Sequence, residues 1–114
     1  MKCWHITPQP LRKSVLIRYW GPNPTEALTA SLQELERVMP NARTTLVVDV
    51  RDVVGHNPDS RHLWQEFMAR HKRNLVAVYL IVPRAWAIHR MVATVMGLAV
   101  GIPMRLVESA DEVR

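Results

Sequence analysis

The sequence predicts a single α/β domain, with a mixed, mostly parallel sheet of about five strands covered by three to four helices. Near-continuous runs of apolar and β-branched residues alternate along the chain with segments of helical periodicity. Such runs are typical of strands that are buried on both faces. The length of 114 residues suits one hydrophobic core, so residues 1–114 are predicted to form a single domain.

The predicted strands are separated by turns rich in Pro and Gly. Residues 3–6 precede the break PQP, and the β-branched and aromatic run SVLIRYW, residues 14–20, ends at GPNP. The runs TTLVVDV, residues 44–50, and LVAVYLIV, residues 75–82, indicate strands buried on both faces. MRLV, residues 104–107, is a last short strand.

Helices are predicted between these strands. The Asn-Pro pair at 23–24 begins the first, since proline is tolerated in a first turn, and Pro40 ends it. The second is predicted over residues 57–72, and a third, unusually apolar helix over residues 84–99. Ser109 is placed to cap a final helical turn. Crossovers between parallel strands are expected to be right-handed.

The cysteine content and the lengths of the apolar stretches bear on the compartment in which the protein works. The single cysteine, Cys3, excludes an internal disulfide and a cysteine-based metal cluster. The longest apolar stretches fall well short of the roughly 20 residues that span a bilayer. The opening segment MKCWHITPQP lacks a signal-peptide pattern. These observations predict a cytoplasmic protein.

The charge is asymmetric. The net charge is +5, and between Arg61 and Arg90 six basic residues face Glu66 alone. Such a surplus can mark nucleic acid, an anionic membrane or an acidic partner, but is more typical of a solvated face. Because no basic strand is interleaved with aromatic residues, a nucleic-acid role is not expected.

The order of elements resembles the STAS domain family, the fold of the sporulation anti-sigma-factor antagonists, in its SpoIIAA-like or STAS/SEC14-like subgroup. The resemblance covers nearly the whole chain. It rests on TTLVVDVRDV as central strand, LVAVYLIVP as the next, and MRLVESADEV as closing strand and helix start. It implies a non-enzymatic regulatory module that binds a switch kinase through the loop and helix after the central strand. In the family, phosphorylation of a serine there breaks the binding.

The chain departs from the family's pattern at that serine. Asp49 matches the acid that ends the family's central strand, whereas Arg51 stands where a serine is usual. Pro58 and Asp59 replace the two serines that open the family's helix, and Ser60 lies one position late. Phosphorylation of Ser60 therefore stays an open alternative, not an implication of the resemblance.

The junction before the second helix has a structural interpretation. Asn57 would cap the helix, Pro58 would take its first position, and Asp59 would suit the positive end of the helix dipole. The functional alternative is an anion or phosphate station at this helix N-terminus, or modification of Ser60 beside Arg61.

Catalysis and metal binding are not expected. Asp52, His56, Ser60 and His62 include the residue types of a hydrolytic site, but no nucleophile elbow or Gly-rich oxyanion loop accompanies them. His62 and Glu66 stand at i, i+4 without a further metal-ligand motif. The four glycines show no nucleotide-binding spacing. We therefore predict no enzyme activity, no metal and no cofactor.

The apolar residues of helix 84–99 cover more than one stripe, which predicts an additional contact surface and a homodimer. The expected dimer surface comprises Trp86, Met91, Val95 and Met96. The sequence thus predicts a regulatory module that docks a partner protein on helix 84–99 and the N-terminus of helix 57–72. The expected partner-binding residues are His56, Asn57, Asp59, Ser60, Arg61, Trp64, Trp86 and Arg90.

The alternative is a SEC14-like domain that binds a lipid, an amphiphile or an anionic membrane surface, and so contacts membranes peripherally. The two hypotheses differ in an observable way. A lipid-binding domain should contain a deep apolar pocket, whereas an interaction module should copurify with a protein.

Overall fold

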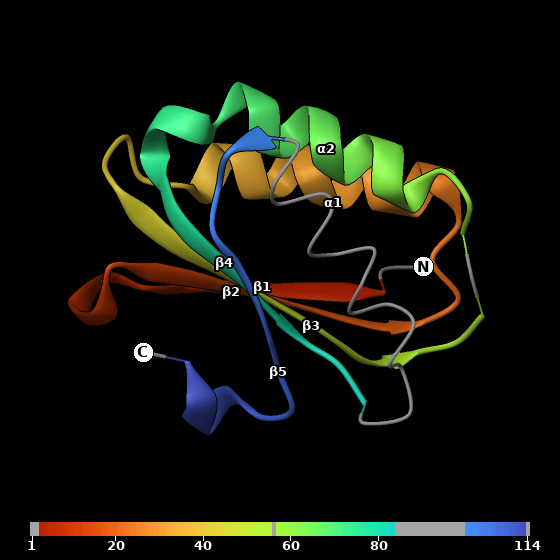
Figure 1. Cartoon of the computed structure of the whole chain (residues 1–114). Coiled ribbons are helices and arrows are strands. Elements are labelled where there is room, and N and C mark those ends of the chain that lie inside the picture. Colours follow the sequence, from red (N-terminus) through yellow and green to blue (C-terminus); the bar gives the residue numbers. More distant parts are fainter. Residues whose placement is uncertain (1–2, 56, 84–99, 114) are drawn as a thin grey trace.

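The computed structural model describes residues 3–55, 57–83 and 100–113. Its sheet has five strands in the spatial order β1-β2-β3-β4-β5 (Figure 1). β1 is antiparallel to β2, and the remaining neighbours are parallel, which confirms the mixed, mostly parallel sheet. The strands are β1 (Trp4–Gln9), β2 (Ser14–Gly21), β3 (Thr44–Val53), β4 (Leu75–Ile81) and β5 (Met104–Val107).

Two strands run further than the sequence indicated. β1 continues through Pro8 to Gln9, because β1 is an edge strand and a proline without an N–H is tolerated there. β3 continues to Val53 because a shift of register between Arg18 and Trp20 lets β2 keep pairing with it.

The described residues contain two α-helices, α1 (Thr25–Val38) and α2 (Ser60–Arg70). Three short 3-10 turns accompany them: η1 (Pro10–Arg12), η2 (Lys72–Asn74) and η3 (Ala110–Glu112). The predicted helix 84–99 lies outside the described residues. The final helical turn is present only as η3, so three to four helices was an overestimate for this part of the chain. No helix among the described residues is both long and apolar enough to cross a membrane.

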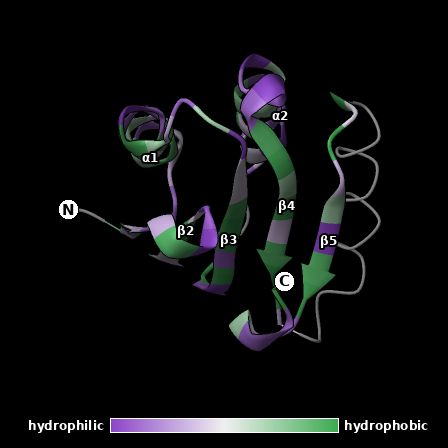
Figure 2. Ribbon diagram, turned by 90° about the vertical axis from the view of Figure 1, so that its left-hand side faces the viewer, coloured by the Kyte–Doolittle hydropathy of each residue, from purple (hydrophilic) through white to green (hydrophobic). Residues whose placement is uncertain are grey.

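Both helices lie on the same side of the sheet (Figures 1 and 2). Alternate strand residues point toward them, so Ile17, Leu46, Val48 and Val78 join the helix residues Leu35 and Phe67 in the main core. The opposite face holds a smaller cluster around Val47, Tyr79, Ile81 and Val107.

The parallel connections give the domain two distinct ends. The carboxyl ends of β2 and β3 lie beside the N-termini of α1 and α2, toward the right of Figure 1. At the left lie η1 in the β1–β2 hairpin, the α1–β3 connection and η2. We call these the helix-start end and the hairpin end.

Candidate functional site

The N-termini of α1 and α2 are joined by side-chain hydrogen bonds at the helix-start end. The hydroxyl of Thr25 donates to Oδ2 of Asp59 at 2.8 Å. Nδ2 of Asn57 donates to the backbone carbonyl of Asn23, also at 2.8 Å. The two helix starts, more than 30 residues apart in the sequence, therefore form one continuous surface.

The turn before α2 differs from the predicted helix cap, and the helix begins later than predicted. Oδ1 of Asn57 accepts the backbone N–H of Asp59 at 3.0 Å, a local side-chain-to-backbone turn. The N–H of Ser60 bonds the carbonyl of Asn57 and closes a tight turn, so the α-helix runs from Ser60 to Arg70, with Asp59 at the N-cap and no side-chain cap bond. The predictions that Asn57 caps the helix and that Pro58 takes its first position are therefore wrong, and the bounds 57–72 are wrong by two to three residues.

A cavity of about 830 Å³ opens beneath these helix starts. Its volume is in the range of small-molecule binding sites, roughly 300–1,000 Å³. The buried part of its described lining is apolar: Tyr19, Leu28, Val48, Met68, Val78 and Val82. Half-buried apolar residues form the walls: Val50, Val53, Trp64 and Leu80. The exposed residues at its mouth are Pro22, Pro24, Thr25, Val54, Gly55, Pro58, Asp59 and Arg61.

The one hydroxyl in the buried part of the described lining, that of Tyr19, already has a hydrogen-bond partner. Tyr19 Oη lies 2.6 Å from Ser31 Oγ, which donates to the backbone carbonyl of Leu28 at 2.6 Å. Burial raises the pKa of Tyr19 well above its usual value, against the smaller lowering effect of Ser31. The phenol therefore stays protonated, and the described floor of the cavity carries no charge.

The mouth contains opposite charges. Asp59 and Arg61 both line it, and the exposed Glu26 lies in the first turn of α1. The Asp59 carboxylate already lies at the start of α2, where an external anion would be favoured by the helix dipole. The arrangement therefore disfavours the anion or phosphate station that was the alternative for this junction.

Five of the predicted partner-binding residues line this one cavity: Asn57, Asp59, Ser60, Arg61 and Trp64. Ser60 is half-buried in its wall. His56, Trp86 and Arg90 lie outside the described residues, as does the expected dimer surface of Met91, Val95 and Met96 with Trp86.

The residue types of a hydrolytic site have other partners in the structure. Asp52 pairs with Arg18 at 2.9 Å, and His62 with Glu66 at 3.0 Å, so neither is bonded to Ser60. Among the residues that the structure describes, no group of three or more His, Cys, Asp and Glu is placed to hold a metal ion.

The sequence interpretation missed the apolar part of this site. Val48 and Val50 of β3 and Val78 and Leu80 of β4 were assigned to the core, yet these helix-facing positions line the cavity near the strands' carboxyl ends. A signal was available, because ligands of open α/β sheets bind outside the carboxyl ends of strands. Alternate residues of adjacent strands at that end were therefore the ones to consider.

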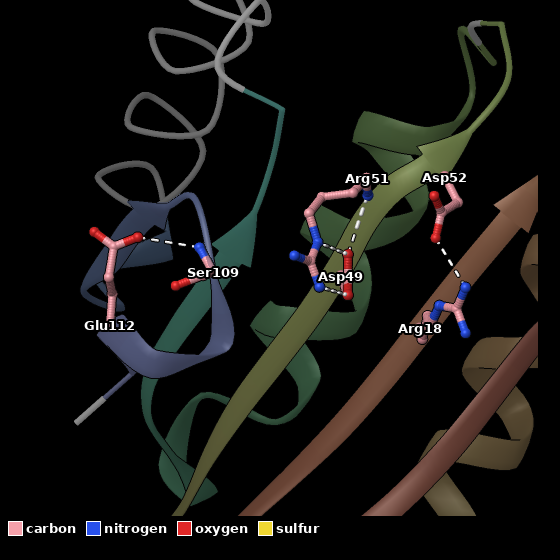
Figure 3. A network of polar contacts seen from close by, with 6 residues as sticks. All are labelled: Arg18, Asp49, Arg51, Asp52, Ser109 and Glu112. Carbon is pink, nitrogen blue, oxygen red and sulfur yellow. Dashed lines mark hydrogen bonds and ion pairs between the residues drawn. The ribbon is translucent and has the colours of Figure 1, made fainter.

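A separate polar network lies on the face opposite the helices (Figure 3). In this network the guanidinium of Arg51 donates to the carboxylate of Asp49, and the guanidinium of Arg18 donates to that of Asp52. Just before η3, the N–H groups of Glu108 and Ser109 donate to the carboxylate of Glu112, in η3, at 2.7 and 3.0 Å. Asp49 and Arg51 are absent from the described lining of the cavity, so they have no direct part in it.

The order β1-β2-α1-β3-α2-β4-β5 and the helices on one face define an α/β module of the SpoIIAA-like fold. A solved structure from Shewanella loihica PV-4 is similar, and it is described as an uncharacterized protein from the DUF3478 family with a SpoIIAA-like fold. The match has a TM-score of 0.74 and covers 96% of this chain and 87% of that chain. At 11% sequence identity the likeness is one of fold, and it confirms the fold resemblance drawn from the sequence. No protein-family model and no curated protein matches the chain.

Proposed function

We propose that this protein is a non-enzymatic binding module and that its cavity takes the apolar part of a small amphiphile. The observation that carries the proposal is the cavity itself, about 830 Å³ with an uncharged apolar floor. An apolar ligand gains free energy by leaving water for such a site, at roughly 25 cal/mol per Å² of apolar surface buried. The lipid-binding hypothesis requires an apolar pocket of this kind, so the cavity supports that hypothesis.

The mouth favours a ligand whose polar end is neutral or zwitterionic. Asp59 and Arg61 present both signs of charge, so a head group with a single charge would be attracted by one residue and repelled by the other. Asn23, also in the lining, has a buried Nδ2 without a hydrogen-bond partner among the described residues. An acceptor oxygen on the ligand would satisfy this donor, whose unmet hydrogen bond is otherwise costly.

The test uses the neutral dye Nile red and two substitutions that fill the cavity. Val50→Phe and Leu80→Phe enlarge wall residues, and Val76→Phe enlarges an exposed residue of β4 outside the lining. We expect saturable binding by the wild type, about tenfold weaker binding by both wall variants, and no change for Val76→Phe. Melting temperatures of the wall variants should not fall, since the new rings occupy empty space. Equal, non-saturable dye uptake by all four proteins contradicts the proposal.

A second candidate function is docking of a partner protein over the cavity mouth. Val54, a large apolar side chain that is 66% exposed, favours it, together with the SpoIIAA-like fold. Ser60→Glu would place a charge in that contact and weaken an acidic partner, while its favourable interaction with the helix dipole, roughly 0.3–1 kcal/mol, protects the fold. Ser60→Ala is the matched control.

Partner capture by the Ser60 variants and by Val50→Phe distinguishes amphiphile binding from protein docking. If Ser60→Glu loses a protein partner that Val50→Phe retains, protein docking is supported and the cavity is secondary. If both Ser60 variants retain the partner, the docking surface lies elsewhere, and helix 84–99 becomes the better candidate.

A further inference from the structure

The positive charge of the chain is concentrated in the three connections at the hairpin end. Residues 9–13, 36–43 and 70–74 contain seven Lys and Arg and one acidic residue, a net +6. The whole chain has a net charge of +5, so all other residues together sum to −1. The basic character of this protein is therefore a property of one end of the fold.

Hydrogen bonds tie these three connections together. The backbone N–H of Thr45 donates to the carbonyl of Lys13, which fixes the hairpin against the start of β3. Arg43 Nη1 donates to the carbonyl of Arg73, which joins the α1–β3 connection to η2. Figure 1 shows the three connections on the same side of the molecule. All seven cations are exposed: Arg12, Lys13, Arg37, Arg43, Arg70, Lys72 and Arg73.

Acidic residues compensate this charge only in part. Glu36 accepts from His71 at 2.8 Å and pairs with Arg70 at 3.4 Å, so it is counted in the +6 already. Asp111 of η3 shares a surface depression with Arg12. With Asp111 included, the hairpin end still has a net +5. Arg37 and Arg70 also stabilise helix C-termini, which explains two of the seven cations but not the other five.

The tip of the hairpin carries an apolar side chain that contacts nothing. Leu11, in η1, is fully exposed and is followed directly by Arg12 and Lys13. It is the most exposed large apolar residue that the structure describes. The tip has a defined turn, since Lys13 adopts the left-handed conformation (φ 51°) and its N–H bonds the carbonyl of Pro10. An exposed apolar side chain followed by two cations fits the boundary between lipid head groups and acyl chains.

We propose that the hairpin end docks on an anionic membrane surface, with Leu11 inserted among the head groups and the cations around it facing acidic lipids. This site is separate from the cavity at the helix-start end and does not depend on the cavity's function. Nucleic acid would satisfy the charge, but it would leave Leu11 without a contact, because phosphate contacts are polar and residues 9–13 contain no aromatic side chain on which a base could stack.

The test measures cosedimentation with vesicles of phosphatidylcholine alone and of phosphatidylcholine with phosphatidylglycerol, roughly three to one. The wild type should bind the mixed vesicles, fail to bind the neutral ones, and be released at about 0.5 M salt, where charges are strongly screened. Each basic residue near such a surface strengthens binding roughly fivefold. Arg12→Gln combined with Lys13→Asn should therefore weaken binding by about 25-fold. Asparagine is chosen to replace Lys13 because it adopts the left-handed conformation readily.

Leu11 gives the sharper test, because substitutions there alter no packing. Leu11→Ser should weaken vesicle binding several-fold, and Leu11→Trp should strengthen it, since tryptophan favours the membrane interface. Arg105→Gln, an exposed cation on β5, is the charge control and should bind like wild type. A short DNA duplex serves as competitor.

Three results would overturn the proposal. One is the absence of binding to anionic vesicles at low salt. Another is equal binding by the wild type, both Leu11 variants and the Arg12 and Lys13 double variant. The third is tight binding of the duplex, unaffected by either Leu11 substitution, which would assign the hairpin end to nucleic acid. Dye binding in the cavity should be unchanged in every hairpin variant, so failure here and failure of the proposed function remain distinguishable.

Discussion

Arg51 encloses the carboxylate of Asp49, two residues before it on the same strand. Arg51 Nη2 lies 2.8 Å from Asp49 Oδ2, while Arg51 Nε and the backbone N–H of Arg51 both donate to Oδ1 at 3.1 Å. Burial tends to raise the pKa of Asp49, but the hydrogen bonds and charge of Arg51, with a smaller contribution from Arg18, lower it overall. Asp49 is thus an ionised residue within β3, which continues to Val53, and not the residue that ends the strand.

Asp49→Asn should destabilise the fold without affecting the cavity. We expect a loss of about 1–2 kcal/mol in the free energy of unfolding at pH 7, since charge-assisted hydrogen bonds at a buried carboxylate are lost. Because the pKa of Asp49 is lowered in the folded state, its contribution is present above the unfolded pKa near 3.9 and disappears as the pH falls through the folded pKa. Urea unfolding of both proteins from pH 7 to pH 2 should show their difference shrinking with acid.

Asp52→Asn is the matched control for that experiment. Asp52 pairs with Arg18 at 2.9 Å, yet both side chains are more than half exposed, so the pair should contribute less than about 1 kcal/mol. Equal losses in the free energy of unfolding from Asp49→Asn and Asp52→Asn would contradict the prediction that the buried pair contributes more than the exposed pair. Nile red binding should be the same for wild type and both variants.

Tyr19 and Ser31 should behave as a coupled pair. Tyr19→Phe leaves Ser31 bonded to the carbonyl of Leu28 and should cost about 1 kcal/mol. Ser31→Ala leaves a buried phenol without its partner and should cost more, about 1–3 kcal/mol. The double variant should lose less than the sum of the single losses, which thermal or urea unfolding would measure. Strict additivity would show that the short contact carries no energy.

Glu36 should contribute a small, pH-dependent stabilisation where α1 and α2 end. The hydrogen bond from His71 is the main cause that lowers the pKa of Glu36, and the nearby Arg70 adds to it. Glu36→Gln should reduce stability by only a few tenths of a kcal/mol at pH 7, since the site is exposed to solvent. Because the pKa of Glu36 is lowered in the folded state, this stabilisation is present above the unfolded pKa and disappears as the pH falls through the folded pKa. Glu66→Gln, which removes a pair within α2, provides the comparison.

Gly55 should tolerate asparagine better than alanine. Its φ is +80°, and a Cβ added there would meet no atom within 4 Å, so any cost arises from the backbone alone. Gly55→Ala should lose about 1–2 kcal/mol, the usual cost for a left-handed L-residue. Gly55→Asn should lose less, because asparagine adopts this conformation more readily. Urea unfolding would rank the three proteins, and a loss from Asn that exceeds the loss from Ala would contradict this order.

Self-association remains a prediction from the sequence. The apolar excess of helix 84–99 predicts a two-fold dimer, although that helix lies outside the described residues. Light scattering should give about twice the 13.1 kDa monomer mass at high micromolar concentration. A mass that stays at the monomer value over this range would contradict the prediction.

The mixed, mostly parallel sheet was predictable because burial on both faces leaves a direct sequence signal. The runs at 44–50 and 75–82 are near-continuous, and the structure places them as the adjacent strands β3 and β4. Element ends were less predictable. Pro8 is compatible with β1 only because β1 is an edge strand, and β3 extends past residue 50 only because β2 shifts its register. Both depend on neighbours that the local sequence does not specify.

The candidate site was predictable in its polar half. Asn57 and Asp59 were candidates because their residue types are common at helix starts, which is a local signal. Their partners, Asn23 and Thr25, lie just before and at the start of α1, so no local pattern identified them. Likewise, a core valine such as Val50 and a cavity-lining valine look the same in sequence. Only the packing of α1 and α2 over the sheet distinguishes them.

The position of Trp64 has a practical consequence. Its ring lines the cavity and meets Tyr19 edge-on at 6.3 Å and Phe67 at 5.7 Å, with interplanar angles of 84° and 75°. A ring held in so asymmetric an aromatic environment gives a strong near-ultraviolet circular dichroism signal, and its emission wavelength follows the polarity of its surroundings. Trp64→Phe isolates that signal from the other tryptophans. On the proposed function, Trp64 would act as an intrinsic optical reporter that distinguishes a preparation with an amphiphile in the cavity from one stripped by organic solvent and refolded, before the amphiphile has been identified.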